Sequence, residues 1–133
     1  MTFRSGEVER ILKRLEAVPG LEGSALISAD GFTLASSLPP GISEDKVAAM
    51  GAAMVSVAER INKELDRGRF EMSIITGSDG YTLATNIGLE AILIVLASKS
   101  ARLGLVFYEV KRAAEELSRV LGASRPESVS PEA

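Results

Sequence analysis

Apolar positions recur at intervals of three and four residues in three segments, a spacing typical of amphipathic helices. The segments are residues 6–18, 44–66 and 101–121. Ser5 and Ser43 stand in front of the first two as candidate N-caps, and a glycine follows within two residues of each segment's end. The pattern therefore predicts three helices, of which the middle one spans about six turns.

Apolar runs that alternate with polar residues, or continue without interruption, predict five strands. We place them at residues 23–29, 32–37, 70–76, 81–86 and 90–97. One motif occurs twice: Asp30-Gly31-Phe32-Thr33-Leu34-Ala35-Ser36 recurs 49 positions later as Asp79-Gly80-Tyr81-Thr82-Leu83-Ala84-Thr85. Asp-Gly between apolar runs favours a hairpin, because glycine accepts positive φ. Two similar hairpins are thus expected on either side of the middle helix.

The predicted order is α-β-β-α-β-β-β-α, in one domain over residues 1–121. Residues 122–133, rich in Ser, Pro and Glu, are expected to form a disordered tail. Residues 91–97 are apolar on both sides, so this strand should be central and covered on both faces. Residues 70–76 alternate, with Phe70, Met72, Ile74 and Thr76 on one side, as in an edge strand. The fold class is α+β: a five-stranded antiparallel sheet between helices, an α/β/α sandwich.

The middle helix carries more apolar surface than one neighbour can bury. One stripe is expected to lie on the sheet: Val47, Met50, Met54, Val57, Ile61 and Leu65. Between Val47 and Ala58 there is no charge and one polar residue, Ser56, so the helix should be buried on most sides. A second copy of the helix would cover the remainder, with the small residues at 48, 51, 52 and 55 allowing close approach. Alternatively, residues 6–18, residues 101–121 or the Pro-rich loop cover it within one protomer.

The composition of the chain argues against several kinds of ligand and catalytic site. The net charge of −3 gives no general attraction to nucleic acid or to anionic membranes. No apolar run approaches the roughly 20 residues of a membrane span, and the N-terminus lacks a signal-peptide core, so we expect a cytoplasmic protein. The chain contains no cysteine and no histidine, which removes disulfides, the commonest metal ligands and the usual nucleophile–base pairs. No phosphate-binding glycine motif occurs. We expect no catalytic residue, metal or cofactor.

Two groups of charged residues are candidate sites. Asp30 and Asp79 are candidate paired acids, although the turns they begin explain both. The charged end of the middle helix includes Glu59, Arg60, Lys63 and Arg67. Such a segment is commonly a solvated helix face, and it is also a candidate for contact with a partner.

Three segments together resemble a known family. They are Leu21-Glu22-Gly23-Ser24-Ala25-Leu26-Ile27 with the following Asp30-Gly31 and Leu34-Ala35, the small-residue-rich middle helix, and residues 93–104 leading into the last helix. In order and spacing they are similar to the Roadblock/LC7 domain, in particular to its gliding-regulator-like bacterial and archaeal members. The resemblance implies a profilin-like fold.

The resemblance also implies a function. Family members dimerise through the central helix and by pairing of the third strand. By position the interface would comprise Val47, Ala48, Gly51, Ala52, Met54, Val55, Ala58, Ile61, Phe70, Met72 and Ile74. Members are usually not enzymes: they bind small Ras-like GTPases as GTPase-activating or scaffold subunits, or serve as dynein light chains. We therefore expect a homodimeric, non-enzymatic GTPase regulator. A small-molecule-sensing module, with a cavity between sheet and helix, is the alternative.

Overall fold

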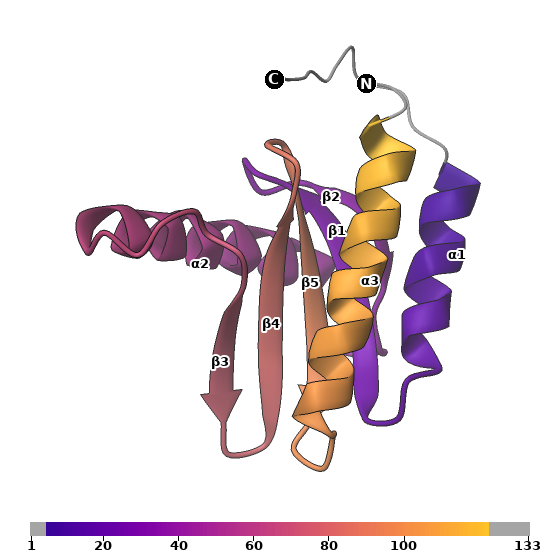
Figure 1. The fold of residues 1–133 in the computed structure, drawn as a ribbon. Helices are drawn as coiled ribbons and strands as arrows, with labels where there is room; N and C mark the ends of the chain where they lie inside the picture. The colour runs from indigo at the N-terminus through magenta and orange to yellow at the C-terminus, as the bar shows by residue number, and fades with distance from the viewer. Residues whose placement is uncertain (1–4, 123–133) are drawn as a thin grey trace.

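The computed structural model describes residues 5–122 and confirms the expected order of elements (Figure 1). The helices are α1 (Ser5–Glu16), α2 (Glu44–Glu64) and α3 (Leu103–Gly122). The strands are β1 (Leu21–Ser28), β2 (Thr33–Ser37), β3 (Ser73–Gly77), β4 (Gly80–Ile87) and β5 (Ala91–Ser98). Gly122 belongs to α3, and the rest of the predicted tail, residues 123–133, lies outside the described residues.

The five strands form one antiparallel sheet in the order β2-β1-β5-β4-β3. As predicted, β5 is the central strand and β3 lies at an edge. Helices α1 and α3 lie side by side on one face, and α2 crosses the other face alone (Figure 1). A single helix covers less of the sheet than two helices do, so part of the sheet face that carries α2 is left open.

The sheet separates two cores, because successive residues of a strand point to opposite faces. Leu26 of β1 packs with α1 and α3, whereas its neighbour Ile27 packs under α2. The first core includes Leu12, Leu83 and Leu117, and the second includes Val55 and Ile94. Every one of these side chains is buried.

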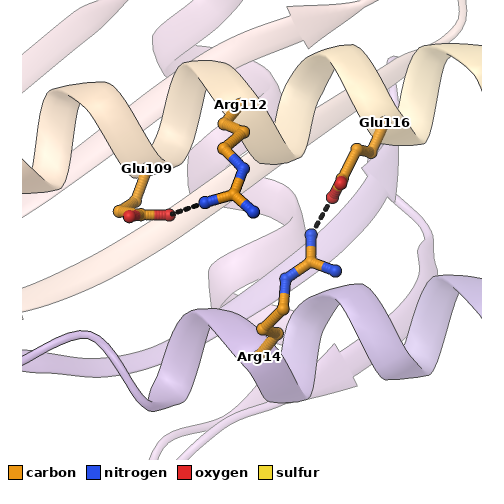
Figure 2. Close-up of polar contacts among 4 residues, drawn as sticks. All are labelled: Arg14, Glu109, Arg112 and Glu116. Carbon is orange, nitrogen blue, oxygen red and sulfur yellow. Dashed lines mark hydrogen bonds and ion pairs between the residues drawn. The ribbon is translucent and has the colours of Figure 1, made fainter.

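One ion pair at the surface joins the two helices of the first layer, and a second lies within α3. Arg14 of α1 contacts Glu116 of α3, while Arg112 Nη1 lies 3.4 Å from Glu109 Oε1 within α3 (Figure 2). Exposed pairs of this kind contribute less than about 1 kcal/mol each. The buried leucines beneath them therefore hold α1 against α3.

The repeated Asp-Gly motif forms two different turns. Gly31 has φ +96°, so the predicted positive φ is confirmed in the β1–β2 hairpin. Gly80 does not have a positive φ; it is the first residue of β4 and pairs with Gly77 across a loop formed by Ser78 and Asp79. A Cβ on Gly80 would lie 2.9 Å from the carbonyl oxygen of Ala97. At Gly80 the absence of a side chain permits β4 to lie close to β5, and the prediction of a positive φ at this glycine is wrong.

The third strand is shorter than predicted, because β3 begins at Ser73 and not at residue 70. Phe70 packs into the core under α2, whereas Met72 packs against the core on the other face. The predicted alternation, which placed both on one side, is therefore wrong before Ser73. The connection is fixed to the sheet by Thr85 Oγ1, which donates to the Glu71 carbonyl oxygen at 2.7 Å.

Candidate protein interface

Helix α2 lies on the sheet through its small residues. The predicted cap is confirmed: the Ser43 hydroxyl accepts a hydrogen bond from the Lys46 amide at 3.2 Å. Ala48, Gly51 and Val55 are the buried residues of the helix. A Cβ on Gly51 would lie 2.6 Å from Ile94 Cδ1, which is closer than real contacts allow. The small residues therefore let α2 lie close to its own sheet. The sequence had suggested instead that they let a second copy of the helix approach.

The larger apolar residues of α2 mostly face away from the sheet. Met50 is 68% exposed, Val57 59%, Ile61 48% and Leu65 62%. The prediction that these four lie on the sheet is wrong, although Val47 and Met54 are partly packed there as expected. The helical period allows either stripe to face inward. Side-chain size decides, because the branched side chains of Ile27 and Ile94 already fill the space beneath the helix.

The exposed stripe adjoins an open sheet edge. Helix α2 contacts β3, and β3 pairs with β4 alone, so every second residue of β3 presents its backbone N–H and C=O away from the sheet. Ile74 and Ile75 of β3 are also exposed, on opposite faces. Ile75 is on the α2 side, and we call the following set the α2–β3 surface: Met50, Val57, Ile61, Leu65 and Ile75.

A groove of about 380 Å³ lies between the first half of α2 and the sheet. Its lining is Ile42, Lys46, Val47, Met50, Gly51, Met54, Ile75, Thr82, Ile94 and Leu96. Lys46 is the one charged residue in this lining. The groove exists because α2 covers only part of its face, and it shares Met50 and Ile75 with the α2–β3 surface.

The charged residues predicted as a partner contact gather at the C-terminal end of α2. Glu59 Oε2 accepts a hydrogen bond from Asn86 Nδ2 at 3.0 Å. Arg60 Nε lies 3.8 Å from Glu64 Oε2, and Arg67 Nε donates to the Leu65 carbonyl oxygen at 3.0 Å. Lys63 is exposed. Two of the four predicted residues, Glu59 and Arg67, therefore help to hold the end of the helix in place.

The two candidate acids lie at opposite ends of the sheet. Asp30 follows the end of β1 and accepts a hydrogen bond from Ser28 Oγ at 2.6 Å, whereas Asp79 is in the loop between β3 and β4. They form no acid pair. Within residues 5–122, no three His, Cys, Asp or Glu side chains gather as metal ligands. The helices of this part of the chain also lack the length and apolar content needed to cross a bilayer.

The residues predicted for a dimer interface divide into three groups. Ala48, Gly51, Val55 and Phe70 are buried against their own sheet. Val47, Ala52, Met54, Ala58 and Met72 are partly buried in the two cores. Ile61 and Ile74 are exposed. Sequence reasoning missed the exposure of Ile42, which stands in a Pro- and Gly-rich loop without periodicity, and it put Ile75 on the other side of the strand from its interface set.

This architecture, a five-stranded antiparallel sheet with two helices on one face and a long helix on the other, defines a small α/β/α domain. The Roadblock/LC7 domain family matches residues 7–97. An uncharacterised protein of Methanocaldococcus jannaschii is 37% identical over 110 residues, which cover 83% of this chain and 96% of that protein. The chain belongs to the Roadblock/LC7 family.

Solved structures share the fold. Myxococcus xanthus MglB superposes with a TM-score of 0.82 at 20% identity, covering 88% of this chain and 96% of that chain. An MglB with a tetrameric arrangement gives 0.83 at 25% identity, covering 90% and 91%. Profilin II of Acanthamoeba castellanii gives 0.56 at 19% identity, covering 89% and 98%. The expected profilin-like fold is confirmed.

Proposed function

We propose that this protein is a homodimeric regulator or scaffold of a small Ras-like GTPase, acting by binding without chemistry of its own. The observation that carries the dimer is the α2–β3 surface, where an exposed apolar stripe adjoins an unpaired strand edge. Contiguous apolar surface of this kind is typical of interaction sites. The tetrameric arrangement of an MglB supports self-association within the fold.

A two-fold axis beside β3 would satisfy both features at once. The same patch on each protomer then faces its copy, so β3 pairs with its symmetry mate and the two sheets become continuous. The two α2 helices lie on the same face of that sheet, where their exposed stripes meet. Val57, Ile61 and Leu65 would be buried there, each with a gain of about 1 kcal/mol for the half of the side chain now in water.

Family membership and the platform that such a dimer presents support a GTPase as the proposed partner. The charged ends of the two α2 helices, with Arg60 and Lys63 exposed, would flank the apolar seam. A partner whose switch loops rest on this platform would be held in one conformation. If the dimer binds one nucleotide state of the GTPase more tightly, it shifts the GTPase population toward that state. The rate of GTP hydrolysis or the localisation of the GTPase would change as a result.

The dimer is tested by sedimentation velocity of the wild type and of Val57→Glu. Each mutant protomer would place a carboxylate in the seam, so we expect a monomer at concentrations where the wild type is dimeric. Ala17→Glu adds the same charge at an exposed position after α1 and should remain dimeric. Ala52 is a poorer choice because it is partly packed on the sheet. A dimeric Val57→Glu variant would refute this assignment.

The regulatory role is tested with the purified Ras-like GTPases of the same genome, loaded with GDP or with a non-hydrolysable GTP analogue. We expect one of them to bind the wild type in a nucleotide-dependent way, and to bind Val57→Glu at least tenfold more weakly. GTP hydrolysis rates with and without the dimer separate activation from tethering. Failure of all these GTPases to bind would exclude the proposed function.

The groove under α2 supports the sensing module as a second candidate. Its apolar walls and the single Lys46 suit a small apolar ligand with an anionic group. A thermal-shift screen of such metabolites would detect it. Because the dimer would cover Met50 and Ile75, a groove ligand should stabilise Val57→Glu more than the wild type. Equal stabilisation of both proteins would place the ligand elsewhere.

A further inference from the structure

The sheet has a second open edge at β2, on the opposite side of the sheet from β3 (Figure 1). Strand β2 pairs with β1 alone. After Ser37 the chain turns inward over β1, where a Cβ on Gly23 would lie 2.6 Å from Pro39 Cδ. Among residues 5–122, only β1 and the turn before β2 form backbone hydrogen bonds at this edge. The outer side of β2 is therefore unpaired.

The strand register identifies the residues of β2 whose backbone points outward. The Ala29 amide donates to the Glu90 carbonyl oxygen, and hydrogen-bonded pairs alternate along an antiparallel ladder, so every second residue of β1 before Ala29 bonds to β5. Ala25 is one of these residues, and Ser36 is its partner in β2. Ser36 therefore presents its N–H and C=O away from the sheet, and Thr33 has the equivalent place nearer the turn.

The strand itself carries no protection against pairing with another chain. Exposed edge strands of native proteins commonly contain a proline or a charged residue that prevents such pairing. The sequence of β2 is Thr-Leu-Ala-Ser-Ser, which has neither. An unpaired edge of this kind can accept an extended peptide as an additional strand, through backbone hydrogen bonds.

Carboxylates border the β2 edge on both faces of the sheet. The Ser36 hydroxyl donates a hydrogen bond to Glu44 at the start of α2, and the Ser37 hydroxyl donates one to Glu16 at the end of α1. A hydroxyl donor is neutral, so it does not balance the charge of either carboxylate. Negative charge therefore flanks the outward backbone of Ser36 from above and below the plane of the sheet.

The other charged residues beside this edge are mostly acidic as well. The set is Glu9, Lys13 and Glu16 on one side of α1, Asp30 in the turn before β2, and Glu44, Asp45 and Lys46 in the first turn of α2. Five of the seven are acidic, and Lys46 lines the groove beneath α2. Arg10 lies one turn before Arg14, whose side of α1 contacts Glu116 of α3. A strand added at β2 therefore meets a net negative charge.

The charge also argues against a second copy of this chain at β2. Two β2 strands paired about a two-fold axis would bring Glu16 and Glu44 of both protomers together, and like charges across an interface disfavour that partner. Basic side chains are the complement. Because neighbouring residues of a strand point to opposite faces, one basic residue would face Glu16 and the next would face Glu44.

We propose that the β2 edge is a docking site for an extended, basic segment of a protein partner, which adds a strand to the sheet. The backbone of the segment bonds to the outward N–H and C=O groups of Thr33 and Ser36. Two consecutive Lys or Arg residues of the segment contact Glu16 and Glu44 on the two faces. The site lies at the opposite edge from the α2–β3 surface, so it does not depend on the proposed dimer or on GTPase binding.

The test starts from random twelve-residue peptides displayed on phage and selected on the full-length protein in low salt. Phage that also bind the double variant Glu16→Gln/Glu44→Gln are removed. We expect the remaining peptides to carry two adjacent basic residues among residues that favour strands. A synthetic, fluorescein-labelled peptide from this set is then measured by fluorescence anisotropy, with circular dichroism to confirm that each variant is folded.

Ser36→Pro removes the outward N–H but no bond to β1, and it should weaken peptide binding at least tenfold. Ser36→Ala loses the same hydroxyl but keeps the N–H, so it should stay within about threefold of the wild type. Glu16→Gln and Glu44→Gln should each weaken binding at least threefold, whereas Glu115→Gln, at an exposed position of α3, should resemble the wild type. Val57→Glu should bind normally, which separates this site from the proposed dimer.

Amide hydrogen exchange of the wild type, followed by nuclear magnetic resonance, tests the strand pairing without any substitution. The Ser36 amide points to solvent in the free protein, so saturating peptide should slow its exchange at least tenfold. The amide of Ser37, which faces β1, should change much less. This measurement decides the proposal even if Ser36→Pro does not fold.

Three results would overturn the proposal. The first is a selection that yields no basic peptide, and the second is an exchange rate of the Ser36 amide that peptide leaves unchanged. The third is protection of the Ser36 amide at high protein concentration without peptide, which would assign the β2 edge to a second copy of the chain.

Discussion

The orientation of α2 predicts that one substitution will have very different effects at positions 55 and 57. Val55 is 3% exposed and faces the sheet, whereas Val57 faces outward. Replacing Val55 by alanine removes two buried methyl groups, a transfer loss of about 1.6 kcal/mol. The cavity left behind adds about 1 kcal/mol, for a total of about 2–3 kcal/mol. At Val57 the buried share of the side chain is less than half, so the loss is about 0.7 kcal/mol without a cavity.

Urea unfolding, followed by circular dichroism, measures both free energies. In thermal scans the Val55→Ala midpoint should fall by roughly 6–15 °C, for a chain of this size. Dimerisation adds a concentration-dependent part to the apparent stability, so each protein is measured at two concentrations a hundredfold apart. The loss of unfolding free energy in Val55→Ala should be the same at both protein concentrations. Any loss in Val57→Ala beyond about 0.7 kcal/mol should appear only at the higher concentration. Equal losses for the two variants at low concentration would refute the orientation of the helix.

Four other substitutions test single contacts. Ser24 is fully buried and its hydroxyl has no hydrogen-bond partner among the described residues, so Ser24→Ala should leave the free energy of unfolding unchanged or raise it by up to about 1 kcal/mol. Thr85→Val removes the hydrogen bond to the Glu71 carbonyl oxygen and should lower the free energy of unfolding by about 1–2 kcal/mol in urea. Ser43→Ala removes the cap of α2 and should cost about 1 kcal/mol in the same assay; an unchanged midpoint would contradict the capping role. Gly51→Ala gains about 1 kcal/mol of helix propensity but meets Ile94 Cδ1, and removal of that atom in Ile94→Val should make Gly51→Ala more favourable by at least about 0.5 kcal/mol in a double-mutant cycle.

The helix and strand order was predictable because each element carries its own local signal. The continuous apolar run of β5 indicated a central strand, and Ser43 marked the start of α2. The beginning of β3 was not predictable from alternation, because Phe70 and Met72 are apolar residues of an irregular connection that happen to follow the same spacing. Likewise, the same Asp-Gly pair serves a left-handed turn at Gly31 and a close strand contact at Gly80.

The candidate surfaces were predictable only in part. The excess of apolar residues on α2 is visible in the sequence, and so is the charged end that contains Glu59 and Arg60. Which stripe is exposed depends on the shape of the sheet beneath.

The sequence by itself determined the elements, their order and the presence of more apolar helix surface than one sheet can bury, because hydrophobic periodicity and capping act over a few neighbouring residues. The tertiary structure alone decided which side of α2 remains in water. Both stripes are apolar, and only the fit of Gly51 against Ile94 selects the small one for the core. It also decided which turns lie together, because the pairing of β1 with β5 brings the turn after β1 beside the turn before β5, where the Ala29 amide donates to the Glu90 carbonyl oxygen.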